Sequence, residues 1–595
     1  MNFNFILKLF FGYVLQIAFT KFVQQNFAPI MHKQLLIILI GFTIYSNSVI
    51  AQTDNVKGWH LLDARQNGYN GISLSPTYQF LKGKKSIPVI VAIIDTGVDT
   101  TQEDLKNILW KNPGETPGNG KDDDGNGYVD DVYGWNFLGG RDGRNIKTES
   151  FEVTRVYHKY KNKYFKKMVD TDTMCNQTRE EYELWKKAAK NLEMKPEEQV
   201  DLMFLEMAFK SARKSEKILK EELNAVEFTA EGVEKFQPQT MRSKQAKLGY
   251  LTFLKITEFE TSETNTSVFS QLEEYILGKK RSSIAKDVAP PNSRAEIVGD
   301  NYNDINDRFY GNNDVMGPSP LHGTHVSGII GAQRENGIGV DGVADNVRIM
   351  MIRALPDGDE YDKDIALAIK YAVDNGAKVI NMSFGKSFSP EKKWVDEAVR
   401  YAELKDVLLV HAAGNEAENN DESDNFPNAT LELYNKNEAN NFITVGASSD
   451  VKLNDGWVAD FSNYGKKTVD VFAPGVKIYS TFPGVHQYGF LKGTSMAAPV
   501  VSGLAALIRS YYPNLSAVQV KHIIEKSVTT FDTSTLVIKP GSKVKVKIAE
   551  LCKSGGVINA YKAIELASAI NAEKPVESKK TILPKSSFKN NKVSR

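Results

Sequence analysis

Residues 87–95 read Ile-Pro-Val-Ile-Val-Ala-Ile-Ile-Asp, an almost unbroken run of β-branched and aliphatic side chains. A run of this length and composition is typical of a β-strand that is buried on both faces. Its last residue, Asp95, is followed directly by Thr96 and Gly97. We therefore expect a carboxylate at the carboxyl end of a strand inside a sheet.

Other segments of the chain repeat this strand pattern in alternation with helices. The further predicted strands are Val347–Ile352, Lys378–Met382, Val407–His411 and Phe442–Val445. Helical patterns lie between them at Tyr361–Asn375 and Pro390–Leu404. Strands that alternate with helices predict a parallel sheet covered on both faces. The expected fold is α/β, with three layers around a central, mostly parallel sheet.

The alternation is interrupted between residues 146 and 300, where the chain is rich in Lys and Glu and poor in Gly. Apolar residues recur there at helical spacing, as in Arg179–Leu192 and Glu197–Leu223. This pattern predicts a large helical insertion with solvated faces. Whether the insertion gates access to a site, inhibits it or assists folding is left open by the sequence.

The overall composition indicates a globular protein without a strong electrostatic preference. The 595 residues carry a net charge of +1, and 41% of them are hydrophobic. This balance gives no electrostatic reason for binding nucleic acid or an anionic membrane. Cys175 and Cys552 are too few for a disulfide framework, so one bridge or two free thiols are both compatible with the sequence.

The N-terminal region carries an export pattern. Residues 31–51 have a basic start, an apolar run and a small residue, Ala51, before Gln52, which predicts a signal peptide and a secreted or periplasmic protein. Residues 1–30 are also apolar, and we interpret them as an upstream extension before the true start. A membrane anchor is the alternative, but the run is short for a span. The Lys- and Ser-rich residues 573–595 predict a disordered tail.

Three short segments carry side chains that act together in nucleophilic catalysis. They read Asp-Thr-Gly from Asp95, His-Gly-Thr-His-Val from His322, and Gly-Thr-Ser-Met-Ala-Ala-Pro around Ser495. Each alone is more often structural, since a serine before a helix is usually only an N-cap. Together they supply a nucleophile, a base whose pKa is near the working pH, and a carboxylate that orients the base.

The order of the three residues along the chain separates the known arrangements. The α/β-hydrolases run Ser, Asp, His with a Gly-x-Ser-x-Gly turn, and the segment around Ser495 lacks the second glycine. Chymotrypsin-like enzymes run His, Asp, Ser, whereas this chain runs Asp, His, Ser. Only the order known from subtilisin fits.

These segments resemble those of the subtilase (subtilisin-like) peptidase family over roughly residues 58–140 and 301–570. The resemblance implies a subtilisin-like fold and the activity of a serine endopeptidase. It implies that Asp95 orients the base, that His322 is the general base and acid, and that Ser495 is the nucleophile. His325 matches a second family histidine that takes no part in catalysis.

Two further segments resemble family landmarks. Ala-Ala-Gly-Asn-Glu from residue 412 implies that the Asn415 amide acts with the Ser495 backbone N–H as an oxyanion hole. Asn-Met-Ser-Phe-Gly from residue 381 resembles the strand that pairs with an extended substrate. The substrate-binding residues implied on the two sides of the primary pocket are Ser383, Phe384, Gly385, Ala413 and Gly414.

Residues 122–131 read Asp-Asp-Asp-Gly-Asn-Gly-Tyr-Val-Asp-Asp, with oxygen side chains at alternate positions. This resembles the first part of an EF-hand loop, although Tyr133 stands where the closing glutamate is expected. A turn-rich loop without an ion is the alternative. The ligands predicted for a structural Ca²⁺ are Asp122, Asp124, Asn126 and Asp130.

The sequence therefore predicts a secreted, monomeric serine endopeptidase that forms an acyl-enzyme on Ser495 and needs no cofactor for catalysis. Polypeptides are its expected substrates, and nucleic acid is not an expected partner. The catalytic domain is expected in two parts, 52–145 and 301–572, on either side of the insertion. A catalytically silent scaffold and a narrowly dedicated processing protease are the alternatives.

Overall fold

The computed structural model of the chain describes residues 57–572, except 167–173, 194–195, 258, 260, 262, 454–455 and 533. The predicted signal peptide, the segment before it and the C-terminal tail lie outside the described residues. The two cysteines form no disulfide with each other, since Cys175 is exposed and Cys552 is buried. None of the described helices is long and apolar enough to cross a membrane.

A nine-stranded sheet forms the centre of the molecule, with strand order β12-β15-β9-β8-β5-β4-β1-β3-β2. Every neighbouring pair is parallel except β12 and β15. The strands are β1 (Val89–Asp95), β2 (Gly134–Asn136), β3 (Val347–Arg353), β4 (Val379–Met382), β5 (Leu408–Ala412), β8 (Phe442–Ser448), β9 (Val471–Pro474), β12 (Thr529–Thr530) and β15 (Gly556–Val557). The strand predicted within residues 87–95 is β1. It lies between β3 and β4 and is buried as predicted.

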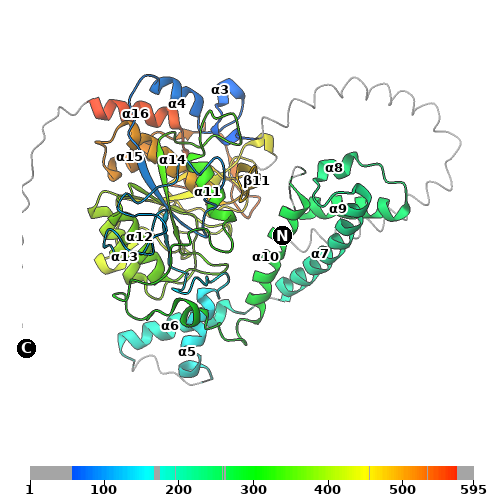
Figure 1. Cartoon of the computed structure of the whole chain (residues 1–595), viewed down its shortest axis with the longest axis horizontal. Helices are drawn as coiled ribbons and strands as arrows, with labels where there is room; N and C mark the ends of the chain where they lie inside the picture. Colours follow the sequence, from blue (N-terminus) through cyan, green and yellow to red (C-terminus); the bar gives the residue numbers. More distant parts are fainter. Residues whose placement is uncertain are drawn as a thin grey trace, which may run out of the picture.

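Helices cover both faces of the sheet because successive side chains of each strand point to opposite sides. Val91 and Ile93 belong to the apolar cluster on one face, and Ala92 and Ile94 to the cluster on the other. The first face carries α4 (Leu74–Leu81), α11 (Leu321–Gly331), α14 (Thr494–Tyr511), α15 (Ala517–Lys526) and α16 (Ala560–Ala572), and the second carries α12 (Asp362–Asp374) and α13 (Lys392–Leu404). The predicted three-layer α/β fold is confirmed (Figure 1).

Short elements complete this body. They include the hairpins β6 (Thr430–Leu431) with β7 (Asn437–Glu438), β10 (Ile478–Thr481) with β11 (Tyr488–Leu491), and β13 (Val537–Ile538) with β14 (Lys545–Val546). The remaining short helices are η1 (Trp59–Leu61), α3 (Ala64–Asn67), η2 (Arg294–Val298), η3 (Glu432–Tyr434), η4 (Val451–Leu453) and η5 (Ile548–Glu550).

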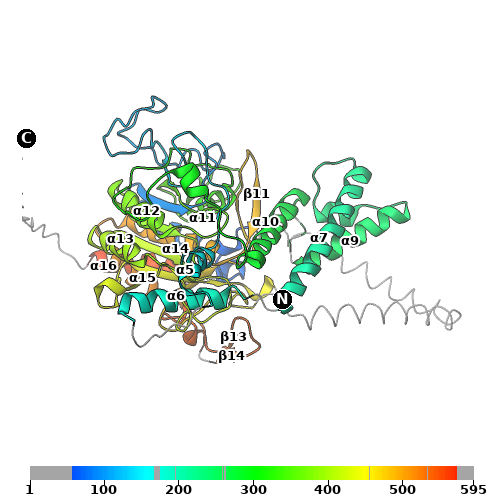
Figure 2. The same cartoon turned by 90° about the horizontal axis from the view of Figure 1, so that it is seen from below.

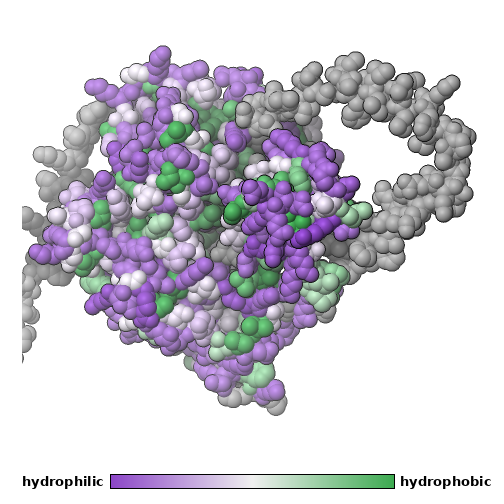
Figure 3. All heavy atoms as spheres, turned by 45° about the vertical axis from the view of Figure 1, so that its right-hand side comes forward, coloured by the Kyte–Doolittle hydropathy of each residue, from purple (hydrophilic) through white to green (hydrophobic). Residues whose placement is uncertain are grey.

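The region between β2 and α11 contains the helices of the predicted insertion, in two groups. One group, α5 (Glu152–Tyr164) and α6 (Asn176–Asn191), lies against the body, where Phe388 joins its apolar cluster. The other group projects away as an arm with its own apolar core (Figure 2). The arm consists of α7 (Pro196–Leu223), α8 (Ala230–Lys235), α9 (Met241–Thr257) and α10 (Asn265–Ile284). Figure 3 shows its surface as mainly hydrophilic, with small separate groups of hydrophobic residues.

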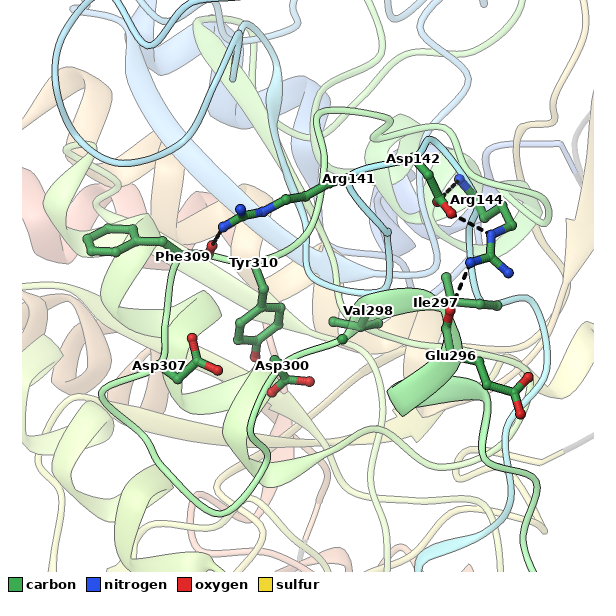
Figure 4. Close-up of a pocket in the computed structure, with 11 residues that line it drawn as sticks. Arg141, Asp142, Arg144, Glu296, Ile297, Val298, Asp300, Asp307, Phe309 and Tyr310 are labelled. Carbon is green, nitrogen blue, oxygen red and sulfur yellow. Dashed lines mark hydrogen bonds and ion pairs between the residues drawn. The ribbon is translucent and has the colours of Figure 1, made fainter.

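The chain enters and leaves the insertion at one place. The Arg144 guanidinium donates to the carbonyl of Glu296 (2.8 Å), and that of Arg141 donates to the carbonyl of Phe309 (3.2 Å). These segments line an open pocket of about 440 Å³ (Figure 4). None of the predicted catalytic residues lines this pocket, which therefore belongs to the joint of the insertion.

Candidate active site

The carboxyl end of β1 meets the first turn of α11 and brings together the predicted carboxylate and base. The Nδ1 atom of His322 lies 2.7 Å from Oδ1 of Asp95. The Asp95 side chain is fully buried, whereas the imidazole is 29% exposed. The backbone N–H of Thr96 donates to the same oxygen (2.7 Å), which fixes the carboxylate. A buried carboxylate thus orients an imidazole that remains accessible to substrate.

The predicted nucleophile lies in the first turn of α14, which packs against α11. Ser495 is partly exposed, and its hydroxyl donates to the carbonyl of Ser383 (3.0 Å). In return, the Ser383 hydroxyl donates to the carbonyl of Ser495 (2.8 Å). These reciprocal bonds hold the segment after β4 beside the helix that carries the nucleophile.

A buried asparagine supports this junction, and the sequence analysis assigned it no role. The Asn381 amide donates to the Ser383 hydroxyl (2.9 Å) and accepts from the hydroxyl of Ser502 (2.8 Å). The available signal was a polar residue inside an otherwise apolar strand, because buried polar groups need hydrogen-bond partners.

The Asn415 side chain is held at the start of α14, the helix that carries Ser495. Its Oδ1 accepts from the backbone N–H (2.9 Å) and the hydroxyl (3.1 Å) of Thr494, which fixes the amide. A Cβ added at Gly493 would lie 3.6 Å from both Asn415 Oδ1 and the Ser495 backbone nitrogen, and 3.7 Å from Asn415 Nδ2. The Asn415 amide and the Ser495 backbone nitrogen therefore lie on the same side of Gly493. Thr494, which orients the amide, was missed by the sequence analysis.

Asn425 stands between the two segments predicted to line the primary pocket. Its Nδ2 donates to the carbonyls of Ala412 (3.2 Å) and Ala413 (2.8 Å) on one side. On the other side, a Cβ added at Gly385 would lie 2.2 Å from its Oδ1. The asparagine thus joins the two walls and fills space between them. The sequence analysis assigned Asn425 no role in the pocket.

Comparison with known proteins agrees with this geometry, since the model of the subtilase family matches residues 87–543. The chain belongs to the subtilase family. It is 42% identical over 207 residues to a thermophilic serine proteinase of Bacillus sp. strain AK1. The matched stretch covers 35% of this chain and 46% of that protein. It is 39% identical over 215 residues to subtilisin DY of Bacillus licheniformis, which covers 36% of this chain and 72% of the relative.

A protease from Pseudoalteromonas arctica is a similar solved structure, with a TM-score of 0.35 and 28% identity over 43% of this chain and 78% of that one. The chain spans about half the length of the thermophilic relative and a quarter of a cell wall-associated protease of Bacillus subtilis.

In this subtilase His325 has a structural environment. Its Nε2 lies 3.0 Å from the carbonyl of Ile478 and 3.2 Å from that of Gly489. Burial lowers its pKa to about 3, so the ring is neutral and bonds the hairpin β10–β11 to α11. This environment accords with the expectation that His325 takes no part in catalysis.

The loop predicted to hold Ca²⁺ uses its carboxylates differently from the sequence prediction. Those of Asp122 and Asp130 accept from backbone N–H groups of the same loop at 2.6–3.2 Å. The Asn126 carbonyl oxygen likewise accepts from a backbone N–H at 2.8 Å. Of the four predicted ligands, Asp124 alone belongs to a group of converging acids.

That group consists of Glu115, Asp124 and Asp131, whose oxygens lie within 4.8 Å of one another. Glu115 is 9% exposed, and its Oε2 has no hydrogen-bond partner among the described residues. Burial raises the pKa of Asp131 to about 6. Three hard oxygen donors, one of them buried and unpaired, fit the ligand preference of Ca²⁺. Glu115 comes before the loop read from the sequence, so an EF-hand pattern could not find it.

Proposed function

We propose that this subtilase is a serine endopeptidase that cleaves polypeptides through an acyl-enzyme on Ser495. The observation that carries the proposal is the 2.7 Å contact between the buried Asp95 carboxylate and the partly exposed His322 imidazole. In the reaction His322 takes the Ser495 proton as Oγ attacks the scissile carbonyl, and gives it to the leaving amine. Water then attacks the ester carbonyl as His322 takes its proton, and His322 returns that proton to Ser495 Oγ as the acid product leaves.

The Ser383 carbonyl couples substrate binding to activation of the nucleophile. Without substrate it accepts the hydrogen bond of the Ser495 hydroxyl. An extended substrate that pairs with the segment after β4 brings its own backbone N–H to this carbonyl. The substrate thereby displaces the hydroxyl, whose proton becomes available to His322.

The test is to treat the purified enzyme with a fluorophosphonate probe and, separately, with casein. Labelling together with cleavage supports the proposal. Labelling without cleavage of casein would mean an active serine behind a restricted cleft. If folded enzyme shows neither with calcium present, a silent scaffold becomes the better interpretation.

Asn425 should restrict the primary pocket to small side chains. We expect peptide substrates with Ala before the scissile bond to be cleaved with a higher kcat/KM than those with Phe, because the asparagine occupies the space between the pocket walls. In Asn425→Gly we expect kcat/KM for Phe to rise by about tenfold or more relative to Ala. Asn428→Ala, in the same loop, is the matched control. A wild-type preference for Phe would contradict the prediction.

We also propose that Glu115, Asp124 and Asp131 hold a structural Ca²⁺. EDTA should then lower the melting temperature by about 5 °C, because the lost ion stabilised only the folded state. Added Ca²⁺ should restore it. Glu115→Gln should remove most of this response, since the variant lacks one buried ligand.

Asp123→Asn is the control for this site, because Asp123 is an exposed neighbour whose carboxylate accepts from Thr116 and Asn119 and lies outside the acidic group. It should keep the response to EDTA. A wild-type melting temperature that EDTA leaves unchanged would remove the ion from the proposal.

Export remains part of the proposed function. The basis is the pattern of a basic start, an apolar run and a small residue over residues 31–51. N-terminal sequencing of protein recovered from outside the cytoplasm should begin at Gln52. A chain that keeps its first residues and stays in the cytoplasm would contradict export.

A further inference from the structure

The first helix of the insertion is bonded to the loops that follow β3 and β4. The Arg155 guanidinium donates to the carbonyls of Asp359 (3.0 Å) and Glu360 (2.9 Å) after β3. The Glu152 carboxylate accepts from the Lys386 ammonium (2.9 Å) after β4. Both loops leave the same edge of the sheet as Asp95 and Ser383. The start of α5 therefore lies beside the segment at which substrate is expected.

The segment after β4 has a free edge next to the nucleophile. The N–H and carbonyl of Gly385 make no backbone hydrogen bond within the described part of the chain, and the residue is exposed. Lys386, by contrast, exchanges both of its backbone bonds with Phe426 (3.1 and 2.9 Å). In an extended segment, the backbone N–H and carbonyl groups of successive residues point to opposite sides. The backbone groups of Gly385 therefore face an incoming strand, whereas those of Lys386 point away from it toward Phe426.

This edge sets the register of an antiparallel substrate. The residue whose carbonyl is attacked lies beside Ser383, which contacts Ser495. The third residue on the acyl side then lies beside Gly385, and the fourth beside Lys386. Cross-strand neighbours share one face of a sheet, so the fourth side chain would point to the same side as the Lys386 side chain.

The space on that side is already filled. The Lys386 ammonium crosses from the β4 loop to the β3 loop, where it donates to the carbonyl of Glu360 (2.8 Å) and pairs with Asp362 (2.8 Å). The Lys386 side chain is only 2% exposed. Its position is therefore part of the protein interior and not of an open groove.

The insertion adds two opposite charges to this interior, those of Glu152 and Arg155. Burial by itself would raise the pKa of Glu152, but attraction by Arg155 and Lys386 lowers it to about 2, so the carboxylate stays ionised. Glu152 is bonded to Arg155 (2.6 Å) and to Lys386 (2.9 Å) with side-chain exposures of 12% or less. The insertion therefore supplies one of the acidic groups, beside Asp362 and Glu360, that stabilise the buried Lys386 ammonium.

We propose that the ionic cluster of Glu152, Arg155, Asp362 and Lys386 closes the substrate groove beyond the third residue on the acyl side of the scissile bond. The inference rests on the proposed endopeptidase function. It adds the number of substrate residues that the enzyme recognises on the acyl side of the scissile bond. The enzyme recognises only the substrate residues that lie beside Ser383 to Gly385. The chain of a longer substrate leaves the groove at the cluster. Four side chains, two of them from the insertion, thereby determine specificity without contact with the reacting atoms.

The test is a series of capped peptide p-nitroanilides that extend from two to five residues, with Ala or Phe at the fourth position. For the wild type, kcat/KM should rise up to three residues and then change by less than about twofold, with no preference at the fourth position. In the charge-balanced variant Glu152→Ala/Lys386→Gly, Phe at the fourth position should gain about tenfold over Ala, because a pocket opens there.

Lys159→Ala is the matched control, because it removes an exposed lysine of the same helix whose partner is Glu391 at 3.8 Å. It should behave as the wild type does. A wild-type enzyme that prefers Phe over Ala at the fourth position by about fivefold or more would overturn the inference. If the double variant fails to fold, as its melting curve would show, the wild-type series alone decides. Absence of fluorophosphonate labelling would instead overturn the proposed function itself.

Discussion

Ser495→Ala is expected to lower kcat for casein and for peptide substrates by about 10⁶-fold, with the melting temperature nearly unchanged. The large loss follows because the proposed mechanism forms its covalent intermediate on this hydroxyl. The change in stability is small because the side chain is partly exposed and contributes one hydrogen bond to the carbonyl of Ser383. Labelling by a fluorophosphonate should disappear together with the activity.

A serine of the same helix provides the control. The Ser510 hydroxyl donates to the carbonyl of Ile87 (2.8 Å) in a buried position at the far end of α14. Ser510→Ala should lower the melting temperature while it keeps both labelling and turnover. The assignment of the nucleophile would be wrong if Ser495→Ala retained labelling, or if Ser510→Ala lost turnover while still folded.

Asn415→Ala is expected to lower kcat by about 10²–10³-fold and to leave KM nearly unchanged. In the proposed mechanism the amide nitrogen donates to the scissile carbonyl oxygen, where negative charge develops, while Thr494 holds the amide oxygen. The bond to this oxygen strengthens as the tetrahedral intermediate forms. Its loss therefore raises the activation free energy of the reaction and leaves substrate binding nearly unchanged. Steady-state kinetics with one peptide substrate separate the two parameters.

Asn440→Ala serves as the comparison, since it removes an exposed asparagine that bonds to Glu403 away from the site. Its kinetics should match those of the wild type. Asn415→Asp should lose at least as much kcat as Asn415→Ala, because a carboxylate repels the developing oxyanion. An alanine variant whose KM rises while kcat stays constant would show that Asn415 binds substrate and does not stabilise the transition state.

The central sheet could be predicted closely because its signal is local. The run that ends in Asp95 became β1, and Phe442–Val445 became the first part of β8. Parallel strands buried on both faces are apolar along their whole length, so each can be recognised in the sequence without knowledge of the strands beside it. The triad residues were predicted from three short segments and from their order along the chain, which are also local signals.

What the sequence could not show depends on contacts between distant residues. Glu152 and Lys386 are separated by 234 positions, and neither has a neighbour in sequence that indicates a shared cluster. Glu115 lies outside the aspartate-rich run, so its convergence with Asp131 appears only after folding. Asn425 was assigned no role because its effect on the pocket depends on Gly385, which follows a different strand.

The joint at which Arg144 bonds the carbonyl of Glu296 has a consequence for the history of the gene. Because the two ends meet, a single event in an ancestral gene could add the whole intervening segment without displacing the strands on either side. Removal is less simple, since loss of the segment would leave the carbonyls of Asp359 and Glu360 without Arg155. Descendants that lose the segment should therefore also carry changes at Lys386 and its surroundings. The insertion is thus easier to gain than to lose.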